Sequence, residues 1–178
     1  SRMSVERIKA ELGIKSDKKI LLYVPTFRGY PAKEQTTLTD AALDRLSKDF
    51  TVVYRGHYFS KTTESGSIVG ADRFSLYKLM IIADVLITDY SSVFFDFAVY
   101  NKPVYLFQPD VEEYKVKRGL YFSAEDLEIP VAYSEADLFD LLACEDYDYA
   151  SLESMNRKFN PHTAEEAVFS FKSIMMHS

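Results

Sequence analysis

The chain has 178 residues and a formal net charge of −6, because 21 Lys and Arg face 27 Asp and Glu. Hydrophobic residues make up 47% of the sequence and charged residues 27%, which is typical of a globular protein and argues against a disordered chain. The length predicts a single domain. The acidic balance gives no reason to expect nucleic acid or an anionic membrane as a partner.

The cysteine content and the apolar runs of the sequence indicate in which cellular compartment the protein is expected. The single cysteine, Cys144, cannot form an internal disulfide or a cysteine-rich zinc site, and it indicates a reducing, cytoplasmic compartment. No apolar run approaches the ~18 residues of a membrane span, and no signal peptide opens the chain. Ser1 and Arg2 are interpreted as residues left by cloning, so the predicted domain covers residues 3–178.

Hydrophobic periodicity predicts alternating helices and strands. A first helix is expected over residues 5–12, with Ser4 as its N-cap and Gly13 as its end. Further helices are expected over residues 40–48, 75–82, 91–100, 134–144, 149–159, and from 161 or 163 to 176. Short apolar or β-branched runs predict strands over residues 19–24, 51–55, 85–88 and 104–107, with a short fifth over 129–132. Residues 56–70 are expected to form a loop.

This alternation predicts an α/β fold with a Rossmann-like, doubly wound and mostly parallel sheet. Ligands of such sheets bind beyond the carboxyl ends of the strands. Three strands end in polar residues: the first in residues 25–29, the second in residues 55–57 and the third in residues 88–92. These polar endings are expected to share one rim of the sheet, which is therefore the candidate site.

Ser91 and Ser92 lie where a helix is expected to begin just after a strand. A helix start carries free N–H groups and a partial positive charge, so it attracts anions, and serine hydroxyls there can donate to phosphate oxygens. The alternative is that Asp89 or Ser91 simply caps the helix. The spacing alone leaves both interpretations open.

Other charged residues of the rim also have two interpretations. His57 is a candidate general base or phosphate ligand, although a lone loop histidine is more often an ordinary surface residue. Arg28 and Arg118 could each bind a phosphate or form an ordinary ion pair at the surface, and the sequence favours neither role. Asp96, one turn after Ser92, could reach a ribose hydroxyl, but a solvated helix charge is the preferred interpretation.

Several kinds of site lack their signatures. Three histidines without paired spacing, and no cysteine cluster, argue against zinc, and the sequence assigns no metal ligand and no cofactor. No P-loop, GxGxxG or GxSxG pattern occurs. Their absence argues against a P-loop ATPase, a standard dinucleotide-binding domain and an α/β-hydrolase.

The sequence ADVLITDYSSVFFDF at residues 83–97, followed by KPV at 102–104, resembles the central motif of the CDP-glycerol glycerophosphotransferases. This family comprises teichoic-acid primases and polymerases. The segments LYVPTFR at 22–28 and RGH at 55–57, and the stretch from EY at 113 to RGLYF at 118–122, agree in kind and order. The similarity is good over residues 19–122 and loose elsewhere.

The resemblance implies the C-terminal, donor-binding lobe of a two-lobe GT-B fold. It implies that His57 is the catalytic residue beside the transferred phosphate, that Ser91 and Ser92 cradle the diphosphate, and that Arg28 and Arg118 offset its charge. The other donor-binding residues that it implies are Thr26, Arg55, Thr88, Asp89, Tyr90, Asp96 and Gly119.

The same resemblance implies the reaction and the partners. A polyol phosphate would pass from CDP-glycerol, or a related CDP-polyol, to an acceptor hydroxyl, and CMP would leave. The acceptor, a glycan or polyol-phosphate chain, would bind a separate N-terminal lobe. The parent enzyme would be cytoplasmic, peripheral on the inner face of the cell membrane.

Three departures from the family pattern leave the donor open. His57 is followed by Tyr58 rather than proline, residues 128–130 replace a Pro-Gly, and Pro161-His162 replaces an Asp-Gly. Two alternatives therefore stay beside the leading hypothesis. One is the donor-binding lobe of a nucleotide-sugar glycosyltransferase, and the other is a non-catalytic Rossmann-like docking module.

Overall fold

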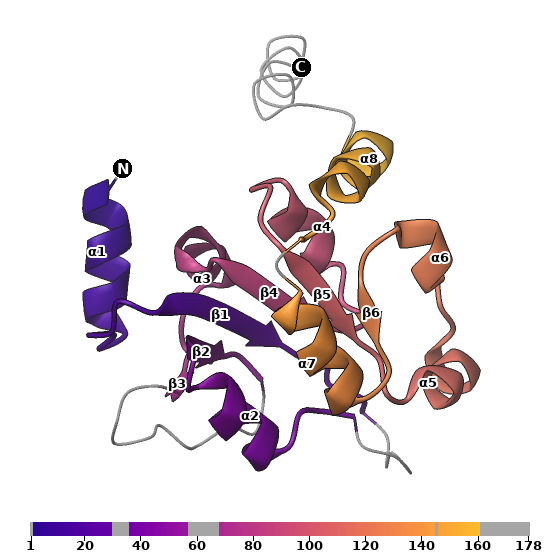
Figure 1. Cartoon of the computed structure of the whole chain (residues 1–178), viewed down its shortest axis with the longest axis horizontal. Coiled ribbons are helices and arrows are strands. Elements are labelled where there is room, and N and C mark those ends of the chain that lie inside the picture. The colour runs from indigo at the N-terminus through magenta and orange to yellow at the C-terminus, as the bar shows by residue number, and fades with distance from the viewer. Residues whose placement is uncertain (1, 30–35, 57–67, 145, 161–178) are drawn as a thin grey trace, which may run out of the picture.

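An all-parallel sheet forms the centre of the computed structural model, which describes residues 2–29, 36–56, 68–144 and 146–160, without the side chains of residues 2–4, 124 and 125 (Figure 1). Within these ranges six strands follow the order β3-β2-β1-β4-β5-β6. The strands are β1 Lys19–Val24, β2 Phe50–Tyr54, β3 Ile68–Gly70, β4 Val85–Thr88, β5 Val104–Phe107 and β6 Val131–Ala132.

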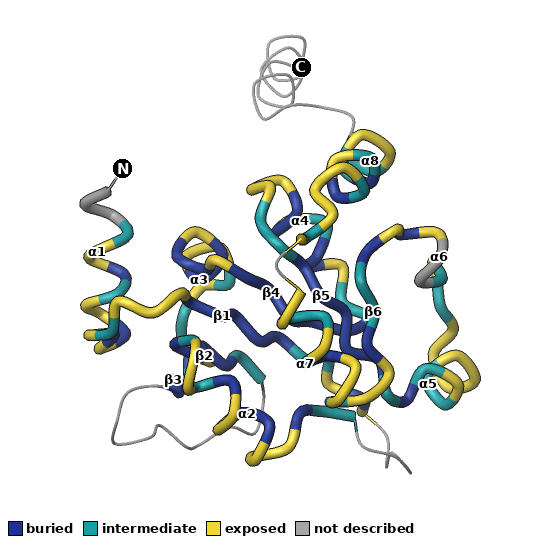
Figure 2. Tube along the Cα trace, viewed as in Figure 1, coloured by how far each residue is buried: buried dark blue, intermediate teal, exposed yellow. Residues whose placement is uncertain are grey.

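Helices cover both faces of the sheet, as the doubly wound prediction requires. One hydrophobic core unites the sheet with α1 Arg2–Glu11, α3 Leu76–Ile82, α4 Val93–Ala98 and α8 Tyr149–Phe159. A second core, on the other face, unites it with α2 Asp40–Leu46 and α7 Glu135–Ala143. The central strands are therefore buried on both sides (Figure 2). Two short helices, α5 Val111–Arg118 and α6 Ala124–Leu127, follow β5.

The strand order reverses at β1, which pairs with β2 on one side and with β4 on the other. The chain moves outward from β1 through β2 to β3, then crosses back to β4 and continues to β6. Ligands of open parallel sheets bind where the order reverses, outside the carboxyl ends of the two diverging strands. The ends of β1 and β4 therefore define the place to look for a site.

The sequence predicted most of these elements. The five predicted strands and the helices from residues 40, 75, 91, 134 and 149 are confirmed within a few residues. The loop prediction for residues 56–70 is wrong at its end, because Ile68–Gly70 pairs with β2 as an edge strand only three residues long. Ser4 is not an N-cap, because α1 begins at Arg2.

Two helices escaped prediction as well as β3, and one predicted helix is not tested. Helix α5 buries none of its residues, so its sequence carries no apolar stripe, and α6 is only four residues long. The helix expected from residue 161 or 163 lies outside the described residues. Among the helices that the structure does describe, none has both the length and the apolar character needed to cross a bilayer.

Two buried threonines give a matched pair for testing the core. The Oγ1 of Thr88 donates to the carbonyl O of Val24 at 2.7 Å, whereas the Oγ1 of Thr51 has no hydrogen-bond partner in the described part of the chain. We expect Thr51→Val to leave the free energy of unfolding unchanged or raise it by up to ~1 kcal/mol, and Thr88→Val to lower it by ~1–2 kcal/mol. Urea denaturation measures both, and a loss of similar size in the two variants would contradict the assignment.

Candidate functional site

The polar ends of β1 and β4 lie side by side at the carboxyl edge of the sheet. The backbone N and the Oγ1 of Thr26 both donate to the Asp89 carboxylate, at 2.9 and 2.6 Å. Asp89 is buried and also accepts the backbone N–H of Tyr90. Thr88 is tied to the end of β1 through Val24. The expected meeting of these two strand ends is thus observed.

Arg28 lies buried between two carboxylates. Its Nη1 donates to Asp89 at 2.8 Å, while its Nε and Nη2 donate to the two oxygens of Asp110 at 2.7 and 3.0 Å. The remaining N–H groups donate to the carbonyl oxygens of Thr26 and Thr36 at 2.8 and 3.3 Å. All five guanidinium N–H groups are therefore used inside the protein.

This environment fixes the charge of Arg28. Burial alone would lower the pKa of the guanidinium, but the hydrogen bonds and charges of Asp110 and Asp89 outweigh it and raise the pKa above its ordinary value. The side chain is only 5% exposed and has no N–H left for a phosphate oxygen. Arg28 was predicted to offset charge at the donor; that remains a prediction, and in this geometry it would act through space.

Two tyrosines join helix α5 to the end of β4. The rings of Tyr90 and Tyr114 stack with centroids 3.7 Å apart, and the Arg28 guanidinium lies 4.9 and 5.3 Å from the two centroids. The hydroxyl of Tyr90 donates to Asp110 at 3.0 Å. Burial and the charge of Asp110 raise the pKa of Tyr90, so the phenol stays protonated and keeps donating.

A first pocket opens where the strand order reverses, and we call it the switch-point pocket. Its volume is about 340 Å³, and it is lined by Val24, Pro25, Thr26, Phe27, Arg55, Gly56, Asp72, Leu76 and Ser91. Arg55 is half-buried and makes a long contact, 3.4 Å, from its Nε to the carbonyl O of Phe74. The pocket thus gathers Thr26, Arg55 and Ser91, three of the predicted donor-binding residues.

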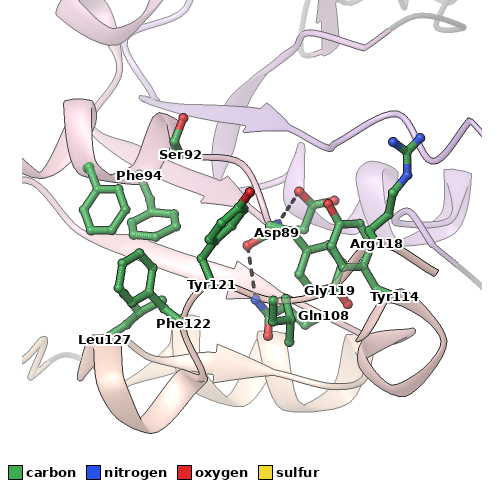
Figure 3. A pocket seen from close by; sticks show the side chains of 13 residues that line it. Asp89, Ser92, Phe94, Gln108, Tyr114, Arg118, Gly119, Tyr121, Phe122 and Leu127 are labelled. Carbon is green, nitrogen blue, oxygen red and sulfur yellow. Dashed lines mark hydrogen bonds between the residues drawn. The ribbon is translucent and has the colours of Figure 1, made fainter. Parts of the chain in front are cut away.

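A second pocket lies on the other side of the β4–α4 turn, and we call it the aromatic pocket (Figure 3). Its volume is about 330 Å³, and its lining is Asp89, Tyr90, Ser92, Phe94, Phe95, Gln108, Tyr114, Arg118, Gly119, Leu120, Tyr121, Phe122 and Leu127. Gln108 donates to the carbonyl O of Asp89 at 3.2 Å. Five predicted donor-binding residues line this pocket: Asp89, Tyr90, Ser92, Arg118 and Gly119.

The two serines of the β4–α4 turn behave differently. Ser91 lines the switch-point pocket, and its Oγ accepts the backbone N–H of Val93 at 3.3 Å. Ser92 lines the aromatic pocket, is exposed, and makes no side-chain capping bond although it holds the N-cap position of α4. The capping alternative therefore describes Ser91 only, and Asp89 is committed to Thr26, Arg28 and Tyr90 instead. A role in cradling a diphosphate stays a prediction for both serines.

The outcomes for His57, Asp96, Arg118 and Gly119 differ. His57 lies outside the described residues. Asp96 is exposed on α4 and lines neither pocket. Arg118 is exposed, and its Nη2 donates to the carbonyl O of Arg28 at 2.8 Å, while Gly119 ends α5 with a φ of 78°. In the part of the chain that the structure describes, no group of three or more His, Cys, Asp or Glu is placed to hold a metal ion.

Sequence reasoning missed three residues of this region. Asp110, Gln108 and Tyr114 were not singled out, although all three follow β5 closely. The rule that predicted the other residues, that polar side chains at the carboxyl end of a parallel strand face the ligand, applies equally to Gln108 and Asp110. Extending it to the fourth predicted strand would have found both.

Comparison with known proteins assigns the chain to a family. Residues 1–168 match the family model described as CDP-Glycerol:Poly(glycerophosphate) glycerophosphotransferase. The chain belongs to this family.

Individual relatives agree with the assignment. A teichoic acid poly(glycerol phosphate) polymerase of Bacillus subtilis (strain 168) is 40% identical over 137 residues, which are 68% of this chain and 18% of that protein. A teichoic acid poly(ribitol-phosphate) polymerase of Bacillus spizizenii is 30% identical over 169 residues, 86% of this chain and 27% of that protein.

A solved structure shares the fold. A variant of the wall teichoic acid polymerase TagF, soaked with CDPG, superimposes with a TM-score of 0.79 at 25% identity, over 99% of this chain and 46% of that one. This chain of the glycerophosphotransferase family therefore spans less than half the length of each of these three relatives.

Two glycines with left-handed backbone test how tightly Arg118 is held. Gly13 and Gly29 have φ of +71° and +68°, but only a Cβ at Gly29 would meet a neighbour, at 2.7 Å from the Arg118 Nη2. Alanine at either position should cost ~1–2 kcal/mol of backbone strain. Gly29→Ala should cost a further ~0.5–1.5 kcal/mol, because it also displaces the Arg118 hydrogen bond. Urea denaturation compares the two variants, and equal losses would contradict this.

Proposed function

We propose that this chain is the donor-binding lobe of an enzyme that transfers a polyol phosphate from CDP-glycerol, or a related CDP-polyol, to an acceptor hydroxyl. The family match over residues 1–168 carries the proposal. A pocket at the reversal of strand order, lined by a half-buried arginine and two hydroxyl side chains, supports it. The TagF variant soaked with CDPG has the same fold, which favours a CDP-linked donor.

The switch-point pocket offers the chemistry that a nucleoside diphosphate requires. Arg55 brings a cation, and Thr26 and Ser91 bring hydroxyls, to the place where parallel sheets bind phosphates. His57 directly follows Gly56, which lines the same pocket, so we assign His57 to the transferred phosphate. In the aromatic pocket, Ser92 and Arg118 flank the opposite side of the β4–α4 turn.

The proposed reaction balances without any further reactant. The acceptor oxygen forms a bond to the β-phosphorus of the donor, and the bond from that phosphorus to the bridging oxygen breaks. The electron pair of the broken bond stays with CMP, and the acceptor proton goes to a base. The lobe contributes position and electrostatics, because cations and N–H groups fixed around the diphosphate stabilise charge as it moves onto CMP.

The rest of the enzyme is proposed from the relatives. These include polymerases of both glycerol phosphate and ribitol phosphate, so the donor polyol is either of these or a close analogue. We propose that a second lobe brings the acceptor, a glycan or polyol-phosphate chain. A CDP-linked donor is a cytoplasmic metabolite class, so we place the reaction on the cytoplasmic face of the membrane.

Nucleotide binding separates the proposal from its alternatives. We expect CDP-glycerol and CMP to raise the melting temperature of this chain, and UDP-glucose to leave it unchanged, because binding to the folded state alone stabilises it. A preference for UDP-glucose would indicate a nucleotide-sugar glycosyltransferase lobe. No shift with any of the three ligands at millimolar concentration would indicate a docking module.

A charge-matched pair of arginines tests the switch-point pocket. Arg55→Gln should weaken CDP-glycerol binding about tenfold or more, since a hydrogen bond to a charged group contributes ~1.5–3 kcal/mol. Arg157→Gln removes the same charge from an exposed position on α8 and should change the affinity less than twofold. Isothermal titration calorimetry measures both. Equal affinities would place the donor elsewhere.

His57 tests the catalytic assignment in the full-length protein. We expect His57→Ala to lower the rate of transfer by ~10²–10⁴-fold, the usual contribution of general acid–base catalysis. CDP-glycerol affinity should change much less, because Arg55 and the serines remain. Incorporation of labelled glycerol phosphate measures the rate, and full activity in the variant would leave His57 without a catalytic role.

A further inference from the structure

Asp110 holds the N-cap position of α5 but does not cap the helix. Aspartate in this position normally accepts a backbone N–H of the first turn, which is worth ~0.5–2 kcal/mol. Here the carboxylate makes no such bond. Its Oδ2 accepts Arg28 Nε at 2.7 Å, and its Oδ1 accepts Arg28 Nη2 and the Tyr90 hydroxyl, both at 3.0 Å. The side chain is therefore directed away from its own helix and into the rim of the sheet.

The buried charged cluster around Asp110 contributes little to the stability of the fold, because its groups lose their hydration. Asp110 is 0% exposed, and Arg28 and Asp89 are 5% and 2% exposed. Two buried acidic side chains share one guanidinium. Buried ion pairs contribute little net stability compared with apolar residues of the same volume, because desolvation offsets their attraction. A positional role therefore explains the cluster better than stability does.

Arg28 links Asp110 to the exposed side chain of Arg118. The backbone carbonyl O of Arg28 accepts Arg118 Nη2 at 2.8 Å. Gly29, next in the chain, lacks the Cβ that would lie 2.7 Å from that same nitrogen. Because the Arg28 side chain is clamped by Asp110 and Asp89, its carbonyl is fixed as well. Arg118, which lines the aromatic pocket in Figure 3, is thereby linked to Asp110 through Arg28.

We propose that Asp110 is a positioning residue for donor binding, which fixes Arg28 and through it places Arg118 against the anionic part of the donor. This inference rests on the proposed function, because it takes the donor to be the CDP-linked anion. Asp110 itself does not contact the donor. It acts only through the geometry of the two arginines.

The first test compares two carboxylates of the same helix. Asp110→Asn keeps the shape but can accept only one of the two Arg28 hydrogen bonds, so CDP-glycerol affinity should fall about tenfold. Glu112→Gln removes the same charge from a side chain that is 84% exposed, and should change the affinity less than twofold. Calorimetry is performed below the melting temperature of each variant, and wild-type affinity in Asp110→Asn would overturn the inference.

A loss of stability must be distinguished from a loss of position. Ile8→Ala, in the core under α1 and away from both pockets, serves as a destabilised control and should keep wild-type affinity. If Asp110→Asn does not fold, Asp110→Glu keeps the buried charge but moves both oxygens by one methylene. It should lower the affinity at least threefold, and wild-type affinity in this variant would count against Asp110 as a positioning residue.

A double-mutant cycle tests whether Asp110 acts through Arg118. If Asp110→Asn and Arg118→Gln each weaken CDP-glycerol binding about tenfold, the double variant should weaken it about ten- to twentyfold, because both changes remove the same contact. A purely structural effect of Asp110 would multiply with the loss of Arg118 and give about a hundredfold. That product would exclude action through Arg118.

A measurement without ligand separates this inference from the proposed function. The Nε–H resonance of Arg118 in the NMR spectrum should shift in Asp110→Asn and stay in place in Glu112→Gln. If the wild-type chain bound no CDP-glycerol, the proposed function would fail, and an unshifted Arg118 resonance in Asp110→Asn would still overturn the placement of Arg118 by Asp110.

Discussion

One guanidinium between two carboxylates holds the functional edge of this molecule together. Parallel strands are joined by crossovers, so no tight turn connects their carboxyl ends. Here Arg28, just beyond β1, binds Asp89 beyond β4 and Asp110 beyond β5. The three strand ends are therefore fixed to one another by side chains. The switch-point pocket is lined in part by the segments after β1 and β4, and the aromatic pocket by the segments after β4 and β5, so this cluster joins segments of both pockets.

The β4–α4 turn divides the site into two unlike halves. Ser91 faces a pocket with an arginine and hydroxyl groups, and Ser92 faces a pocket walled largely by aromatic rings. The two serines are thus neighbours in sequence but line different pockets.

The sequence predicted the sheet and most of its helices because buried strands and amphipathic helices leave strong periodic signals. It missed α5 because that helix buries none of its residues, and it missed β3 because three residues are too few for a pattern. The rim was predicted from strand ends, which local sequence reveals. The pairing of Arg28 with Asp110 was not predicted, because Asp110 lies 82 residues further along the chain. Nothing in the sequence near Arg28 shows that this arginine is buried.

The central place of β1 also determines when the site can form during synthesis. Thr26 and its partner Asp89 are 63 residues apart in the sequence, and Arg28 and Asp110 are 82 residues apart, so each partner is synthesised much later than the residue it binds. A ribosome therefore exposes the first strand, and an unpaired arginine beside it, well before their partners emerge. Contacts of such sequence separation form late and slowly. The cluster of Arg28, Asp89 and Asp110 can thus be completed only after most of the sheet has been synthesised, and a chain released before residue 110 would lack one of the two carboxylates that hold Arg28.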